Sequence, residues 1–175
     1  MLPPIHLTRW IDEHRDQLKP PVGNKVLYED SEFIIMVVGG PNARSDFHIS
    51  DSEEFFYMLE GDMNLRVEED GKLRDIPIKE GEVFLLSAGT PHCPQRTAGS
   101  IGLVIERTRR KGELDGIRWY CENCHHILYE DFFELYDIVE QLRERIERFH
   151  HDPSLHTCDQ CGTVAQIPTA PQSND

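Results

Sequence analysis

The sequence predicts an all-β protein with minor α content, in which an antiparallel sandwich or barrel precedes a small helix and a four-cysteine metal knuckle. Three observations predict this class. Short β-rich runs alternate with turn residues between positions 26 and 106, one amphipathic stripe follows, and two C-x-x-C pairs flank that stripe. Short strands at this spacing, with no long helical pattern between them, are typical of antiparallel sheets.

The N-terminal segment predicts a short helix from Thr8 to Leu18. Thr8 is a candidate N-cap, and Pro20 with Pro21 would stop the helix. The segment carries charges throughout without an apolar core of signal-peptide length, and no stretch of the sequence is long and apolar enough to span a bilayer. We therefore expect a cytoplasmic protein.

The central segment predicts the strands of the sandwich or barrel. Each candidate strand is rich in β-branched, aromatic or other apolar residues, and turn residues such as glycine separate the runs. The candidates are Phe33–Val38, Phe55–Leu59, Leu65–Val67, Val83–Leu86 and Ile101–Ile105. We assign residues 1–110 to one domain and residues 111–175 to a C-terminal extension.

The C-terminal extension begins in the charged connector RTRRKGELDG and predicts a helix from Asp131 to His150. Apolar residues recur there at three- and four-residue steps, which is the period of one helical face. They are Phe132, Leu135, Tyr136, Val139, Leu142, Ile146 and Phe149. The polar, proline-rich tail after Gln166 is expected to be extended.

The charge balance limits the partners of the protein. The 175 residues include 32 acidic and 18 basic side chains, which gives a formal net charge of −14. Such a surface repels phosphate backbones, so we expect no nucleic-acid partner. An acidic small molecule would have to meet locally placed cations, which makes isolated arginines near a candidate site informative.

His48, Glu54 and His92 form the candidate metal site of the β-rich region. Two imidazoles and one carboxylate on one side of an ion are the ligands of non-haem Fe(II) oxygenases, because three positions stay open for substrate and dioxygen. A lone histidine is more often an ordinary surface or core residue. The joint spacing of the three ligands with Gly61, Gly81 and Gly89 favours metal binding.

This spacing resembles the two sequence motifs of the cupin superfamily, H-x-H-x(3,4)-E-x6-G and G-x5-P-x-G-x2-H-x3-N. Ser50 stands where cupins often carry a second histidine, Ser87 replaces the proline, and Arg96 replaces the final asparagine. The first departure lowers the number of ligands from four to three, and the last places a guanidinium beside the metal. Both departures favour an anionic, chelating substrate.

A closer resemblance is to the 3-hydroxyanthranilate 3,4-dioxygenase family, of the bacterial and fungal type with a C-terminal rubredoxin-like metal site. The segments PNARSDFHISDSEEFFYMLEGDM, RDIPIKEGEVFLL, AGTPHCPQR, GLVIER and KPPVGNK carry it. The resemblance implies a cupin double-stranded β-helix (a jelly-roll barrel), a homodimer and catalytic Fe(II). The implied reaction converts 3-hydroxyanthranilate and O2 to 2-amino-3-carboxymuconate semialdehyde, a quinolinate precursor in tryptophan catabolism or NAD biosynthesis.

The same resemblance implies roles for three further residues. The substrate carboxylate needs a cation, and Arg44 and Arg96 are the candidates, because a guanidinium binds a carboxylate through two parallel hydrogen bonds. Glu106, after the last candidate strand, is implied to face the amino and hydroxyl groups and to accept a proton or hydrogen bond. Taken alone, each would more often belong to a solvated ion pair.

The two C-x-x-C pairs predict a second metal site. Cys121, Cys124, Cys158 and Cys161 can supply four thiolates to Fe or Zn in a tetrahedron. Ring opening by dioxygen consumes no external electrons, so we expect this ion to stabilise the fold and not to carry electrons.

Three other functions remain open at this stage. A cupin dioxygenase acting on another phenolic acid would share the three ligands and differ in the residues around them. A non-enzymatic cupin that senses a small acid would bind its ligand without consuming oxygen. A rubredoxin-type electron carrier would have no need of the β-rich domain.

Overall fold

The protein is described by a computed structural model that covers residues 2–19, 23–29, 31–42 and 44–167. The helices are α1 (Leu7–His14) and α2 (Ile138–His151), with 3₁₀ turns at Arg15–Gln17 and Pro153–Leu155. The strands are β1 (Asn24–Val26), β2 (Phe33–Gly39), β3 (Phe47–Ile49), β4 (Glu54–Glu60), β5 (Met63–Glu69), β6 (Lys72–Ile78), β7 (Val83–Leu86), β8 (His92–Arg96), β9 (Ile101–Arg107), β10 (Asp115–Tyr120) and β11 (Ile127–Phe133).

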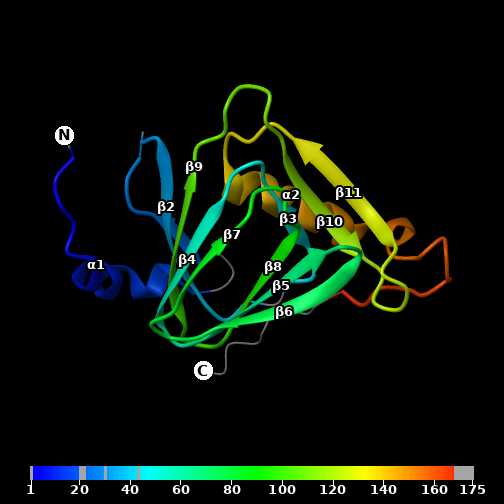
Figure 1. The fold of residues 1–175 in the computed structure, drawn as a ribbon, viewed down its shortest axis with the longest axis horizontal. Helices are drawn as coiled ribbons and strands as arrows, with labels where there is room; N and C mark the ends of the chain where they lie inside the picture. Colours follow the sequence, from blue (N-terminus) through cyan, green and yellow to red (C-terminus); the bar gives the residue numbers. More distant parts are fainter. Residues whose placement is uncertain (1, 20–22, 30, 43, 168–175) are drawn as a thin grey trace.

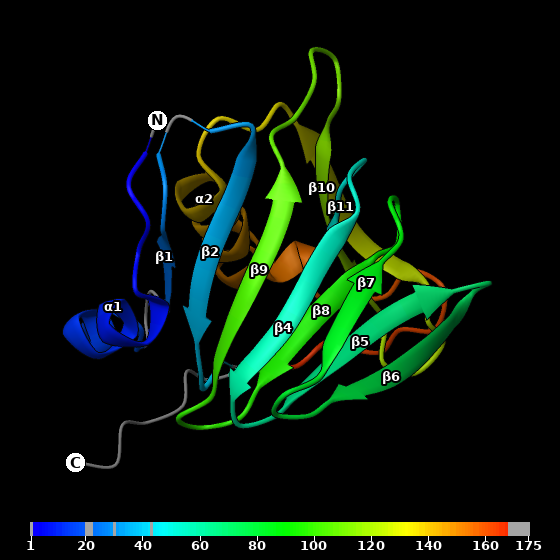
Figure 2. The same ribbon diagram turned by 60° about the vertical axis from the view of Figure 1, so that its left-hand side comes forward.

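The strands form two antiparallel sheets that face each other (Figure 1). The five-stranded sheet has the order β1-β2-β9-β4-β7, and the six-stranded sheet has the order β11-β10-β3-β8-β5-β6. Strands far apart in the sequence lie side by side, as β2 and β9 do (Figure 2). The predicted all-β class with minor α content is confirmed.

The core between the sheets follows from the two-residue alternation of the strands. Phe56 and Met58 on β4 and Leu65 on β5 are buried, and Val104 on β9 packs with them. Because successive side chains of a strand point to opposite faces, the residues between these positions face outward. The strands predicted at five places are confirmed, and each contains or matches the predicted range.

Helix α1 covers part of the outward face of the five-stranded sheet. Ile11 packs there with Val37 and Ile101. The helix begins at Leu7, because His6 and not Thr8 caps it: His6 Nδ1 accepts a hydrogen bond from the Arg9 amide at 3.4 Å. It ends earlier than predicted, at His14, where the 3₁₀ turn Arg15–Gln17 follows. The predicted stop at Pro20 and Pro21 falls outside the described residues, as does the end of the predicted extended tail.

The predicted helix from Asp131 to His150 is wrong in its first seven residues, about two turns. Residues 127–133 form strand β11, which pairs along its length with β10. The helix begins only at Ile138, because the Asp137 carboxylate accepts a hydrogen bond from the Glu140 amide at 3.0 Å and caps it. Tyr136, expected on the buried stripe, is 81% exposed.

The six-stranded sheet continues beyond residue 110. Strand β10 pairs with β3, with Ile117 opposite His48, so residues after the predicted boundary complete the sheet that carries the first candidate ligand. Trp119 of β10 stacks on Phe149 of α2 with ring centroids 4.2 Å apart. The division into two domains at residue 110 stays a prediction. Within the described part of the chain, no helix combines the length and apolarity needed to cross a membrane.

Candidate metal centre and active site

The three predicted ligands lie together between the two sheets. His48 is the middle residue of β3 and is the register partner of His92, the first residue of β8. Glu54 is the first residue of β4 in the opposite sheet. All three side chains are buried, and one ligand atom from each lies within 4.8 Å of the others. The spacing seen in the sequence therefore corresponds to one cluster in space.

The Glu54 carboxylate bridges the two imidazoles. Its Oε1 lies 3.3 Å from His48 Nδ1, and its Oε2 lies 3.3 Å from His92 Nε2. Glu54 Oε1 is buried and accepts no hydrogen bond from any residue that the structure describes. A buried carboxylate oxygen without such a bond is costly, so this donor set fits a divalent transition-metal ion that would occupy the space between the three side chains.

The far nitrogen of each imidazole is held by an acceptor. His48 Nε2 lies 2.6 Å from Asp115 Oδ2, and His92 Nδ1 lies 3.0 Å from the Thr90 carbonyl oxygen. Both acceptors require a proton on that nitrogen, which leaves His48 Nδ1 and His92 Nε2 to face Glu54. Such outer contacts set the orientation and tautomer of metal-binding histidines.

The contacts of His48 also change its proton affinity. Burial lowers the pKa of His48, but the hydrogen bond to Asp115 and the nearby negative charge of Glu54 outweigh burial and raise the pKa to about 9. A metal ion that binds His48 must therefore displace the Nδ1 proton, as is general for ligands of this type.

Arg96, at the end of β8, is a buried cation that has no acidic partner among the residues that the structure describes. Its side chain is 5% exposed, its Nη1 lies 3.4 Å from Met58 Sδ, and its Nε makes no hydrogen bond within the described residues. Burial, and then the nearby charge of Arg44, lower the pKa of Arg96 to about 10. A guanidinium in this state is a site for an external anion.

Arg44, the other arginine predicted at the site, is already paired. Its Nε lies 3.1 Å from Asp46 Oδ1, and its second contact is between Nη2 and Asp46 Oδ2. Asp46 is 2% exposed, and the Arg44 side chain is partly exposed. Its charge is therefore matched by Asp46, whereas none of the described residues matches the charge of Arg96.

Glu106 is the register partner of Glu54 on the neighbouring strand β9. It is 2% exposed, and its Oε2 lies 2.7 Å from Arg109 Nη1. Burial, and then the negative charge of Glu54, raise the pKa of Glu106 to about 7. Glu106 is thus a carboxylate beside the three ligands that can exchange a proton near neutral pH.

Two buried residues of the site were missed in the sequence, Arg109 and Asp115. Both lie in the segment that was interpreted as a charged connector. The side chain of Arg109 is 5% exposed and that of Asp115 is 0% exposed, and the two form a two-bond ion pair with Nε–Oδ1 and Nη2–Oδ2 distances of 2.6 Å. Charge alone gave no signal, because the sequence does not show that β10 pairs with β3.

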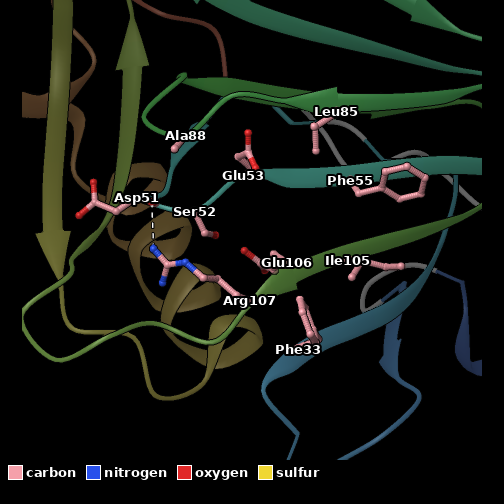
Figure 3. Close-up of a pocket in the computed structure, with 10 residues that line it drawn as sticks. All are labelled: Phe33, Asp51, Ser52, Glu53, Phe55, Leu85, Ala88, Ile105, Glu106 and Arg107. Atoms are coloured by element: carbon pink, nitrogen blue, oxygen red, sulfur yellow. Dashed lines mark hydrogen bonds between the residues drawn. The ribbon is translucent and has the colours of Figure 1, made fainter.

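A pocket of about 350 Å³ lies on the outward side of the five-stranded sheet (Figure 3). Phe33, Phe55, Leu85 and Ile105 form its apolar wall, and Glu106 also lines it. Figure 3 also shows the hydrogen bond from Arg107 Nη2 to the Asp51 carbonyl oxygen, which is 3.1 Å long. This apolar wall is on the opposite side of the sheet from the three ligands, because Phe56 and Val104 point into the core.

The four predicted cysteines form a second cluster at the far end of β10. Cys121 Sγ lies 3.6 Å from Cys161 Sγ, and Cys124 Sγ lies 3.5 Å from Cys158 Sγ. All four sulfur atoms lie within 4.8 Å of one another. The two turns match, since the amides of His125 and Gly162 donate to the carbonyl oxygens of Cys121 and Cys158 at 2.9 and 2.8 Å. Four thiolates so placed fit a tetrahedral ion.

Known proteins match this chain over most of its length. A family model described as 3-hydroxyanthranilic acid dioxygenase matches residues 1–150. A 3-hydroxyanthranilate 3,4-dioxygenase of Xanthomonas euvesicatoria pv. vesicatoria (strain 85-10) is 54% identical over 168 residues, which cover 96% of this chain and 95% of that protein. Another of that name, from Bacillus cereus (strain ATCC 10987 / NRS 248), is 45% identical over 161 residues, which cover 91% and 90%.

Among solved structures, protein NMB1881 from Neisseria meningitidis is similar with a TM-score of 0.46 and 20% sequence identity. The match covers 60% of this chain and 99% of that chain.

Proposed function

The chain belongs to the 3-hydroxyanthranilic acid dioxygenase family, and on that premise we propose that it opens the aromatic ring of 3-hydroxyanthranilate at one Fe(II) ion held by His48, Glu54 and His92. The product would be 2-amino-3-carboxymuconate semialdehyde. Fe(II), when bound, would bring substrate and dioxygen together so that electron density passes from the ring to oxygen.

One observation carries the choice of substrate: Arg96 is buried without an anionic partner among the described residues. His92 and Arg96 are four residues apart on β8, so both side chains point to the same face. A substrate that satisfies both ends needs a chelating group at the metal and a carboxylate at the guanidinium. 3-Hydroxyanthranilate has an adjacent amino and hydroxyl pair together with a carboxylate.

The residues of the chain would then divide the work. Arg96 binds the substrate carboxylate with two parallel hydrogen bonds and so fixes the orientation of the ring. Glu106 accepts a proton or hydrogen bond from the amino or hydroxyl group, which its position beside Glu54 allows. Arg44 stays paired with Asp46, which leaves Arg96 as the cation that meets the substrate.

The four cysteines would hold Fe or Zn in a structural role, since they join the turn after β10 to the turn after α2. A homodimer and a cytoplasmic location remain predictions.

Oxygen uptake tests the proposed function. The purified chain is loaded with Fe(II) without air, mixed with 3-hydroxyanthranilate, catechol or gentisate, and then exposed to oxygen. We expect one O2 consumed per 3-hydroxyanthranilate, with a new absorbance band, and little uptake with the other two. His92→Ala is the matched control and should remove the uptake. Faster oxidation of catechol or gentisate, or metal-loaded protein that consumes no oxygen, would contradict the proposal.

A further inference from the structure

We propose that Arg109 and Asp115 are a positioning pair, which holds His48 in its metal-binding tautomer and holds Glu106 in place on the substrate side. The inference rests on the proposed function, because it assigns roles toward the same metal and substrate. The pair lies outside both cupin motifs, and it joins two parts of the site that the sequence places 58 residues apart, His48 and Glu106.

Asp115 is the acceptor that fixes His48. The carboxylate is fully buried, and Asp115 Oδ2 lies 2.6 Å from His48 Nε2. Because an ionised carboxylate can only accept, the His48 proton must be on Nε2, and Nδ1 is left for the metal. The position follows from the sheet: Ile117 is opposite His48, and Asp115 lies two residues before it on the same face of β10.

Arg109 holds two carboxylates at once. Its Nε and Nη2 each lie 2.6 Å from an Asp115 oxygen, while its Nη1 lies 2.7 Å from Glu106 Oε2. The guanidinium plane therefore sets the position of the His48 acceptor and of the candidate proton acceptor together. Only a forked group with several fixed N–H donors can do this; an ammonium group is a single point of charge.

The Asp115→Asn variant changes this arrangement without changing the shape of the side chain. Asparagine offers one acceptor oxygen and one donating NH2 group, whereas Arg109 presents two donors and His48 presents a third. If the amide oxygen stays with Arg109, the NH2 group faces His48 Nε2 and drives the proton to Nδ1. His48 then cannot bind a metal ion through the nitrogen that faces Glu54.

The test compares four full-length proteins with the cysteine site loaded: wild type, Asp115→Asn, Arg109→Lys and Glu113→Gln. Glu113 is the matched control, because it is an acidic residue of the same connection that pairs with Arg107 and not with the site. Fe(II) is titrated without air to give the affinity of the site formed by His48, Glu54 and His92. Long-range ¹H–¹⁵N spectra of the Zn(II)-loaded proteins report the tautomer of His48.

We expect Asp115→Asn to bind Fe(II) at His48, Glu54 and His92 about 10- to 100-fold more weakly, the range typical for loss of such outer contacts. In its spectrum the His48 proton should move from Nε2 to Nδ1. Arg109→Lys should keep the Nε2 proton, bind the ion less weakly than Asp115→Asn does, and lose kcat at saturating Fe(II) and substrate. Glu113→Gln should match wild type in all three measurements.

Two results would overturn the proposed positioning role. One is an Asp115→Asn variant with wild-type Fe(II) affinity and a proton on His48 Nε2; the other is an Arg109→Lys variant with wild-type Fe(II) affinity and kcat. If Asp115→Asn does not fold, Arg109→Lys decides alone. Wild type that binds Fe(II) at His48, Glu54 and His92 but oxidises no 3-hydroxyanthranilate overturns the proposed function and leaves the positioning role of Arg109 and Asp115 unaffected. Wild type that binds no ion at this site overturns both proposals.

Discussion

Arg96, which is buried, and Arg44, which is partly buried, differ in whether a described residue supplies an anion. Arg44 has Asp46, and Arg96 has no acidic partner among the described residues. A buried charge without a partner costs free energy that the protein tolerates only when the charge is used. Stability and activity should therefore respond in opposite directions when Arg96 is replaced.

The Arg96→Met variant tests this opposition. Removing the unpaired charge should raise the free energy of unfolding by about 1–3 kcal/mol. Loss of the carboxylate contact should raise the activation free energy by about 2–5 kcal/mol and so lower kcat/KM. Iron content should not change. Denaturant unfolding and steady-state kinetics measure the two effects. The comparison variant Arg44→Met leaves buried Asp46 without its ion-pair partner and should lower the free energy of unfolding. Unchanged kinetics in Arg96→Met would remove Arg96 from the substrate site.

At the level of single residues, the sequence predicted the three ligands because their order along the chain is fixed by motif spacing. It also singled out Arg96, Arg44 and Glu106, whose roles stay predictions. It missed Asp115, because a lone aspartate in a charged connector becomes a partner of His48 only when β10 pairs with β3. Such long-range pairing is not encoded in local spacing.

Among the elements, strand β9 shapes the place where Arg96 lies. A Cβ atom on Gly102 would lie 2.5 Å from Arg96 Nη1 and 3.0 Å from Met58 Sδ. No side chain fits there while the guanidinium keeps its position, so the glycine on β9 gives the arginine on β8 its space.

We predict that Gly102→Ala displaces the guanidinium and raises KM for 3-hydroxyanthranilate by about tenfold or more, equivalent to about 1.4 kcal/mol, with Fe(II) binding unchanged. Steady-state kinetics and metal analysis measure the two quantities. A change to alanine at Gly71, which has open space around it but a positive φ of 75°, is a control for backbone strain alone. Equal KM in wild type and Gly102→Ala would contradict this account of the cavity.

The elements that the sequence predicted well are those with one clear period. Strands β2, β4 and β7 alternate or are continuously apolar, and they were found. The end of β11, residues 131–133, was assigned to a helix because Phe132 extends the three- and four-residue steps of α2. Pairing with β10 decides its structure, and the Asp137 cap then sets the helix start.

For the whole molecule, the cysteine cluster ties the C-terminal segment to the six-stranded sheet. It brings the turn after β10 together with the segment after α2. The stacked rings of Trp119 on β10 and Phe149 on α2 pack the same two parts of the chain together. Repulsion among the surface charges, with a net charge of −14, destabilises the compact state. A metal ion held by the four cysteines would therefore add to the stability that hydrophobic burial gives.

We predict that Cys124→Ser removes the ion of the cysteine cluster and lowers Tm, by about 2–4 °C for each kcal/mol lost. At temperatures well below Tm, kcat should stay within about twofold, since none of the proposed catalytic residues lies in this cluster. Calorimetry and metal analysis measure the effect, with Cys93→Ser, a change outside the cluster, for comparison. A variant that keeps its metal and its Tm would show that the cluster has no structural role.

The unmatched charge of Arg96 has a consequence for which molecules the protein accepts. An aminophenol that lacks the carboxylate offers the same two donor atoms to the metal, but it would seal the guanidinium away from water without an anion. Rejection of such an analogue therefore requires no steric clash. If Arg96 binds the substrate carboxylate as proposed, its unpaired charge would supply the selectivity, which should be strongest against neutral compounds of the correct size.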